Sequence, residues 1–167
     1  MRQTREGACT LPDRCLTRPI LSGGMSLTHP WRDLRALVHV VVHHVDLHPG
    51  VWGVGDGESR IWLDRRLGQV ERRCTLAHEL EHLHRGHRGC QDEATEGHVA
   101  AAAARYLLPD PHAVADALVW ARGDIETAAD ELWVDEPTLR ARLDARHLHP
   151  AERAIIVARV NALEVGA

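Results

Sequence analysis

The sequence has no lysine and no phenylalanine, and all 20 of its basic residues are arginine. It has no apolar run near the roughly 20 residues that a helix needs to span a bilayer, which excludes a transmembrane helix and gives no reason to expect a membrane partner. Basic residues are not in excess, because the sequence has 20 arginines and 24 acidic residues, and its formal net charge is −4. This balance argues against a protein whose main surface binds nucleic acid.

Cysteine motifs of the metal-binding type are also absent. The four cysteines form no Cys-x-x-Cys pair, so a zinc site built on cysteine has little support. No apolar segment of the signal-peptide type stands near the first residues. We therefore expect a cytoplasmic protein whose thiols are reduced.

What is present is a pattern typical of a mainly helical α+β fold. Residues 1–24 lack a periodic apolar pattern and are expected to be disordered. Two short runs rich in Val, Ile and Trp flank Gly55-Asp56-Gly57 and predict a small antiparallel β-hairpin. The five tryptophans are expected in the core, because the chain has no phenylalanine. The predicted helices cover 31–45, 67–84, 92–108, 111–121 and 150–163, with a helix–turn–helix pattern over 125–143.

One motif within the predicted helix 67–84 carries chemistry. His78-Glu79-Leu80-Glu81-His82 has the spacing HExxH. Residues four apart lie on one face of a helix, so both imidazoles can reach one ion. Glu79 lies about 100° round the helix from His78, where it can contact a water on the ion without binding the ion itself. The pattern is that of a hydrolase in which Zn²⁺ lowers the pKa of a bound water towards about 7 and the glutamate takes its proton.

A catalytic zinc site of this kind needs a third protein ligand, and the next helix offers two candidates. Glu96 shares a helix face with small apolar residues that can pack on the motif helix, so we favour it. His98 is the alternative, and it lies about 200° from Glu96 round the helix, so only one of the two can point at the metal. Tyr106 is a further candidate, because its hydroxyl can polarise the substrate carbonyl in the transition state.

Two histidines follow the motif closely. The longer pattern HExxHxxGxxH needs a glycine where this chain has Arg85. It also places its last histidine six residues after the second, whereas His87 follows His82 by only five. His87 is therefore not predicted as a ligand. We interpret His84 and His87 as surface residues. The alternative is that they contact and support the metal ligands.

The run RIWLDRRLGQVERRCTLAHELEHLHRGH (60–87), followed by DEATEGHVAAAAARYLLP (92–109), resembles the ImmA/IrrE metallopeptidases. Members pair a strand ending in Leu-Asp with an arginine-rich helix start before TLAHELxH, and their second helix has the form ExxAxxxAAxxLLP. The similarity covers roughly residues 31–120. The remaining segment is similar to the tails of actinobacterial and actinophage members.

The resemblance implies a zincin-like metallopeptidase domain over residues 25–121 and a helical, helix–turn–helix-like region over 122–167. It implies that His78 and His82 bind Zn²⁺ and that Glu79 is the catalytic base. Many members have a glutamate at the position of His98, so the third ligand stays open between Glu96 and His98. The implied activity is a zinc-dependent endopeptidase of the cytoplasm that cleaves a helix–turn–helix repressor of a phage or mobile element.

A second hypothesis is a non-catalytic regulator that binds a repressor or DNA through its C-terminal helices and keeps a structural or vestigial metal site. Residues 120–149 carry four arginines against seven acidic residues. Binding to phosphates needs clustered positive charge, so the composition disfavours DNA as the partner of this region. A protein partner, such as a repressor, is the preferred expectation.

Overall fold

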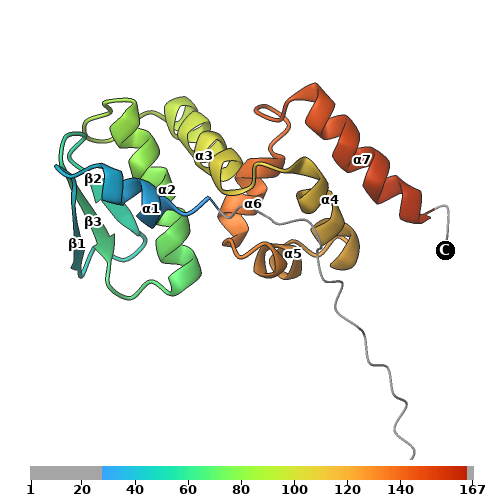
Figure 1. Ribbon diagram of the computed structural model, residues 1–167, viewed down its shortest axis with the longest axis horizontal. Helices are drawn as coiled ribbons and strands as arrows, with labels where there is room; N and C mark the ends of the chain where they lie inside the picture. The colour runs from blue at the N-terminus through green and yellow to red at the C-terminus, as the bar shows by residue number, and fades with distance from the viewer. Residues whose placement is uncertain (1–27, 165–167) are drawn as a thin grey trace, which may run out of the picture.

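The computed structural model describes residues 28–164, which form seven helices and one three-stranded mixed sheet (Figure 1). The expected α+β class is therefore confirmed, whereas the predicted arm at 1–24 lies outside the described residues. Within them, no helix combines the length and the apolar character required to cross a membrane. The elements in chain order are α1 (Pro30–Ala36), β1 (Val41–Val45), β2 (Gly53–Gly55), β3 (Arg60–Asp64), α2 (Gln69–His84), α3 (Glu93–Leu107), α4 (Pro111–Trp120), α5 (Ile125–Glu131), α6 (Glu136–Leu143) and α7 (Pro150–Glu164).

The sheet has the strand order β1-β3-β2 and lies at one end of the molecule (Figure 1). β2 and β3 pair antiparallel, which confirms the predicted hairpin. β1 pairs with β3 in parallel, so the sheet is mixed and not the purely antiparallel sheet that we expected. Asp56 stabilises the hairpin turn, because its Oδ1 accepts backbone N–H bonds from Glu58, Ser59 and Arg60 at 2.8 to 2.9 Å.

The helix predicted over 31–45 was wrong in its second half. α1 ends at Ala36, and Val41–Val45 form the strand β1. The valine run also fits a strand, since β-branched residues favour extended backbone and gain hydrogen bonds from β3. His43 and His44 therefore stand in a strand and not at a helix end. The ring of His43 stacks on Trp62 of β3 with 5.9 Å between the ring centroids.

The motif helix α2 lies between two apolar clusters. On one side, Leu76 and Leu80 pack against Ile61 and Leu63 of β3. On the other side, Cys74 and Ala77 belong to a larger cluster with the helices that follow. The members of that cluster from α3 to α7 include Ala103, Leu107, Val114, Leu118, Ala128, Ala129, Leu139 and Ile156.

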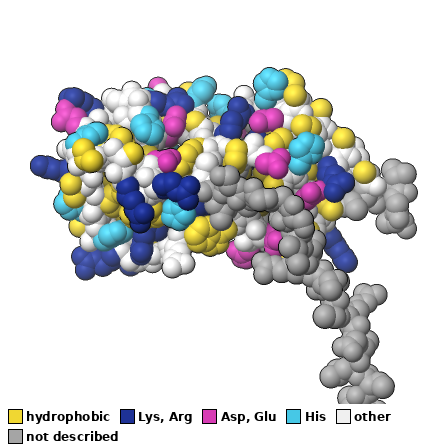
Figure 2. All heavy atoms as spheres, viewed as in Figure 1, with side chains coloured by type: hydrophobic (Ala, Val, Ile, Leu, Met, Phe, Trp, Pro, Cys, Tyr) yellow, Lys and Arg dark blue, Asp and Glu magenta, His cyan; other side chains and the backbone are white. Residues whose placement is uncertain are grey.

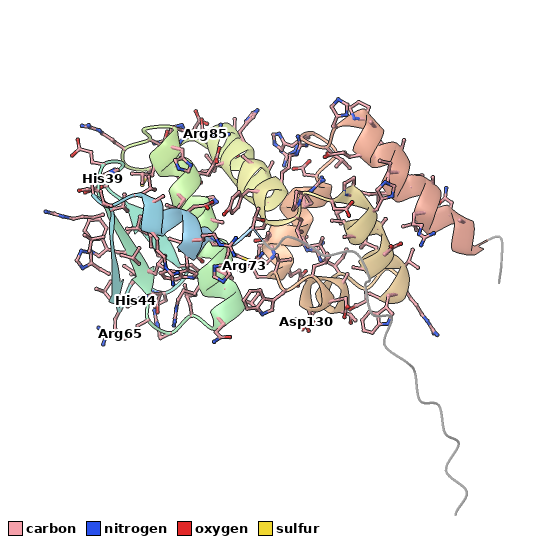
Figure 3. All side chains as sticks on the ribbon, viewed as in Figure 1. His39, His44, Arg65, Arg73, Arg85 and Asp130 are labelled. Atoms are coloured by element: carbon pink, nitrogen blue, oxygen red, sulfur yellow. The ribbon has the colours of Figure 1, made fainter. Side chains whose placement is uncertain are left out.

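The larger cluster unites the two predicted regions, because the boundary expected between residues 121 and 122 falls inside it. The expected helix–turn–helix segment forms α5 and α6, and Trp133 between them has a left-handed φ of 56°. Arg73 of α2, labelled in Figure 3, is 1% exposed and holds this turn. Its Nη1 donates to the Trp133 carbonyl at 2.8 Å. The turn before α6 is thereby tied to α2, whereas α6 itself packs against α3 and α5.

The prediction that the tryptophans form the core was wrong for three of the five, whereas Trp31 is partly buried against the cluster of Leu76 and Leu80. Trp52, Trp120 and Trp133 are 39%, 49% and 37% exposed, respectively. Alanines and leucines fill the larger cluster instead. Alanine lets helices approach closely, and the resulting interfaces leave no space for an indole ring.

Candidate metal centre

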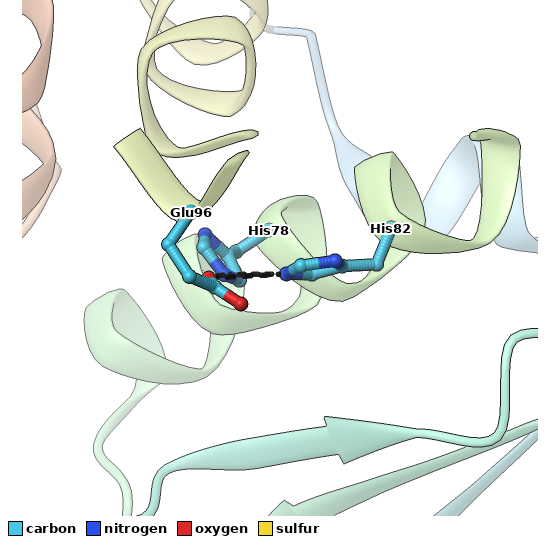
Figure 4. A group of neighbouring side chains, drawn as sticks. All are labelled: His78, His82 and Glu96. Atoms are coloured by element: carbon cyan, nitrogen blue, oxygen red, sulfur yellow. Dashed lines mark hydrogen bonds and ion pairs between the residues drawn. The ribbon is translucent and has the colours of Figure 1, made fainter. Parts of the chain in front are cut away.

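The histidines of the HExxH motif and Glu96 meet at one point, where α2 and α3 lie side by side (Figure 4). The Nε2 atoms of His78 and His82 are 3.0 Å apart. The Oε2 atom of Glu96 lies 3.3 Å from each of them. The three side chains can therefore present one ligand atom each to a single ion.

The donor set fits a tetrahedral divalent ion. Zn²⁺ binds imidazole nitrogen and carboxylate oxygen at about 2.0–2.2 Å, and a tetrahedron with such bonds places its ligand atoms about 3.3–3.5 Å apart. The observed separations of 3.0 to 3.3 Å are close to this value. Burial and the neighbouring His82 lower the pKa of His78, which favours the neutral imidazole that a metal requires. Three protein ligands leave a fourth position for water or substrate.

Local structure brings Glu96 to this point. α3 begins where the Asp92 carboxylate caps the helix by accepting the N–H of Thr95 at 2.7 Å. The cap fixes the first turn of α3, and Glu96 stands in that turn. Small residues further along α3, including Ala103, join Ala77 of α2 in one cluster and keep the two helices close.

The two other residues considered for this site lie elsewhere. His98 is exposed on α3, where its Nδ1 lies 2.7 Å from the Ala94 carbonyl and its ring meets that of His147 at 4.6 Å. Of the two candidate ligands, the structure therefore brings Glu96 and not His98 to the motif histidines. The Tyr106 hydroxyl, near the far end of α3, donates to the carboxylate of Asp33 in α1. Its position gives no support to a role in stabilising a transition state.

Glu79 is 7% exposed and lies under the strand β2. No described residue donates a hydrogen bond to its carboxylate, and burial, with a smaller effect of Glu96, raises its pKa to about 7. A Cβ atom at Gly53 would lie 2.5 Å from Thr75 Cγ2 and 3.0 Å from Glu79 Oε1. Gly53 therefore permits a contact between β2 and α2 that a larger residue would prevent.

A cleft of about 610 Å³ opens beside these groups. α2, α3, α6 and the segment 50–53 contribute to its walls, so the C-terminal helices take part in the site. Small side chains such as Ala100, Ala103 and Ala141 line much of it, together with the indole of Trp52. Such a lining suits an apolar side chain better than a charged one.

The structure places His87 beside the site, which fits the alternative considered for it rather than the favoured interpretation as a surface residue. Its Nδ1 lies 3.1 Å from the Nδ1 of His82, on the side of the ring away from Glu96. His84 is exposed, as expected. The only signal in the sequence is that His87 follows the motif closely. Its position beside His82 depends on the conformation of the loop after α2.

Among residues 28–164, no second group of histidine, cysteine and acidic side chains is placed to hold an ion. Basic, acidic and histidine side chains are spread over the face in Figure 2 rather than gathered in one patch. No protein-family model, curated protein or solved structure matches this chain. The chemistry of the His78, His82 and Glu96 cluster is accordingly the basis for a functional conclusion.

Proposed function

We propose that the protein is a zinc-dependent endopeptidase. One observation carries the proposal, namely that two imidazoles and a carboxylate place their ligand atoms within 3.0 to 3.3 Å of one another beside a buried glutamate. A zinc ion bound there supplies a Lewis acid, which polarises a peptide carbonyl and lowers the pKa of water. His78, His82 and Glu96 hold the ion, and the cluster is unlike a purely structural site because it leaves one position open.

Glu79 is the general base of this proposal. It follows His78 directly on α2 and shares the cleft with it. Its carboxylate accepts a proton from the attacking water and delivers this proton to the leaving amine. Since no described residue donates a hydrogen bond to the carboxylate, no other partner competes with the water for it.

β2 is the element that can align a peptide with Glu79. It stands at an edge of the sheet, where β3 pairs with one side of it and no described strand pairs with the other. An extended peptide can add to such an edge through main-chain hydrogen bonds. Because Gly53 and Gly55 bring the strand against Glu79, a peptide bound there runs beside the base.

The proposed substrate is a helix–turn–helix repressor of a phage or mobile element, cleaved in the cytoplasm. This part of the proposal rests on the resemblance of the motif helix and α3 to the ImmA/IrrE metallopeptidases. The cleft is compatible with it, since an apolar lining accommodates the apolar side chains that protein substrates offer. DNA is not part of the proposal, because the segment containing α5 and α6 has an acidic excess.

The decisive experiment compares zinc-loaded wild type with Glu79→Gln on a peptide library prepared from a bacterial proteome. Cleaved bonds are identified by mass spectrometry. We expect at least a 100-fold loss of cleavage with zinc content unchanged, because general-base catalysis contributes about 10²–10⁴ in rate.

Glu81→Gln is the matched control, since Glu81 stands two residues further on the same helix and pairs with Arg85 at 2.7 Å. It is expected to cleave like the wild type. Equal cleavage by wild type and Glu79→Gln would contradict the proposal. Zinc-loaded wild type that cleaves no peptide and no repressor would favour the non-catalytic regulator instead.

A further inference from the structure

We propose that His87 is a positioning residue that orients the ring of His82 for metal binding. The inference rests on the proposed metal site and adds a residue to it. Its basis is the pair of Nδ1 atoms of His82 and His87, which lie 3.1 Å apart. This separation is a hydrogen-bond distance, so one nitrogen of the pair donates and the other accepts.

The metal decides which nitrogen donates. His82 turns its Nε2 towards His78 and Glu96, so Nε2 must be without a proton when it binds an ion. The proton of the neutral His82 ring then sits on Nδ1 and points at His87. His87 must accept through its own Nδ1 and carry its proton on Nε2. The pair is therefore compatible with metal binding in one combination of neutral tautomers only.

Two segments hold His87 where it can accept this bond. Its backbone N–H donates to the His82 carbonyl at 3.0 Å, which closes the loop directly after α2. The hairpin turn contacts it from outside, because a Cβ atom at Gly57 would lie 2.2 Å from the His87 carbonyl oxygen. Next to it, Arg88 forms an ion pair with Glu58 of the same turn. The turn between β2 and β3 therefore packs against the backbone of His87, from which the ring extends towards His82.

Such an acceptor matters for the metal more than for the fold. A histidine ligand whose second nitrogen is bonded keeps its tautomer and ring orientation, and loss of the partner typically costs 10–100-fold in metal affinity. Because His87 accepts this bond without a negative charge, it can orient the His82 ring and leave Glu96 as the only negative ligand of the proposed site.

The test is the zinc affinity of purified variants, measured by competition with a chromophoric chelator. We expect His87→Ala to bind zinc about 10–100-fold more weakly than the wild type. His87→Asn is expected to restore most of the affinity, because the amide oxygen of asparagine occupies the position of the histidine Nδ1. His84→Ala serves as the control, since His84 is the exposed last residue of α2, the helix that carries His82.

A second measurement uses the unaltered protein and does not depend on how a variant folds. Long-range ¹H–¹⁵N spectra of the zinc-loaded chain are expected to show His82 protonated on Nδ1 and His87 on Nε2. A proton on Nδ1 of His87, or a zinc affinity of His87→Ala within twofold of the wild type, would overturn the proposal while leaving the peptidase proposal intact. Wild type that binds no zinc would overturn both.

Discussion

Glu96 and His98 stand two residues apart on α3, yet only Glu96 faces the motif histidines. Replacement of Glu96 by alanine removes one of three ligands and leaves two imidazoles on one helix. We expect Glu96→Ala to lower zinc affinity by more than about 100-fold, since even the loss of a residue that supports a ligand costs up to that much. Elemental analysis of the gel-filtered protein measures the bound zinc directly.

His98→Ala is the matched control for this prediction, because it removes an imidazole from the same helix without touching the cluster. It is expected to keep one zinc per chain. Stoichiometric zinc in Glu96→Ala, or its loss in His98→Ala, would show that the third ligand has been assigned to the wrong residue.

At the scale of the single element, β2 is the strand whose glycines decide how closely it approaches α2. A Cβ atom at Gly53 would stand 2.5 Å from Thr75 Cγ2, whereas one at Gly55 would meet its nearest neighbour, Glu79 Oε2, at 3.4 Å. Gly53→Ala therefore forces the strand or the helix to move. We expect it to lower the free energy of unfolding by about 1–3 kcal/mol, the usual cost of overpacking. Urea titration provides the measurement.

Gly55→Ala lies in the same strand and gives the comparison. Neither glycine has a positive φ, so the two substitutions differ in the space available and not in backbone strain. Gly55→Ala is expected to unfold at nearly the wild-type urea concentration. If both variants lose stability equally, the close approach of β2 to Thr75 is not what requires glycine at position 53.

Among the elements, those with a strong local pattern could be predicted from the sequence. The helix that carries the HExxH motif and the position of Glu96 followed from helical periodicity, because the faces of a helix depend only on residue spacing. β1 was missed because its valine run suits a helix as well as a strand. Its partner strand β3 is also distant in sequence, so no local pattern indicates the pairing. For His87 the sequence favoured a surface position and left a role beside the metal ligands as the alternative, because its place depends on contacts with Gly57, which no local pattern encodes.

At the scale of the whole molecule, the C-terminal helices complete the site that the motif begins. Ala141 of α6 lines the cleft together with the segment that contains Trp52. Arg142, which is 2% exposed, fixes α6 by donating to the Leu108 carbonyl at 2.9 Å and to Glu152 of α7 at 3.1 Å. The helices after residue 121 therefore form part of the wall of the cleft.

We expect Ala141→Leu to lower kcat/KM for peptides with bulky apolar side chains by about tenfold or more, because a leucine fills part of the cleft. Zinc content is expected to stay unchanged. Competition between peptides that differ at one residue near the cleaved bond provides the measurement. Ala145→Leu, at an exposed position after α6, is the control and is expected to cleave as the wild type does. Identical peptide preferences in the two variants would show that α6 takes no part in substrate selection.

The burial of α2 on two sides has a consequence for how this chain can vary. Seven of its 16 residues are buried, and they are Arg73, Cys74, Thr75, Leu76, Ala77, Glu79 and Leu80. A helix constrained by the sheet, by the helical core and by the proposed metal site can accept few substitutions. Sequence variation is therefore expected to collect on α7, where Ile156 is the one buried residue among those the structure describes, while α2 changes slowly or loses its chemistry.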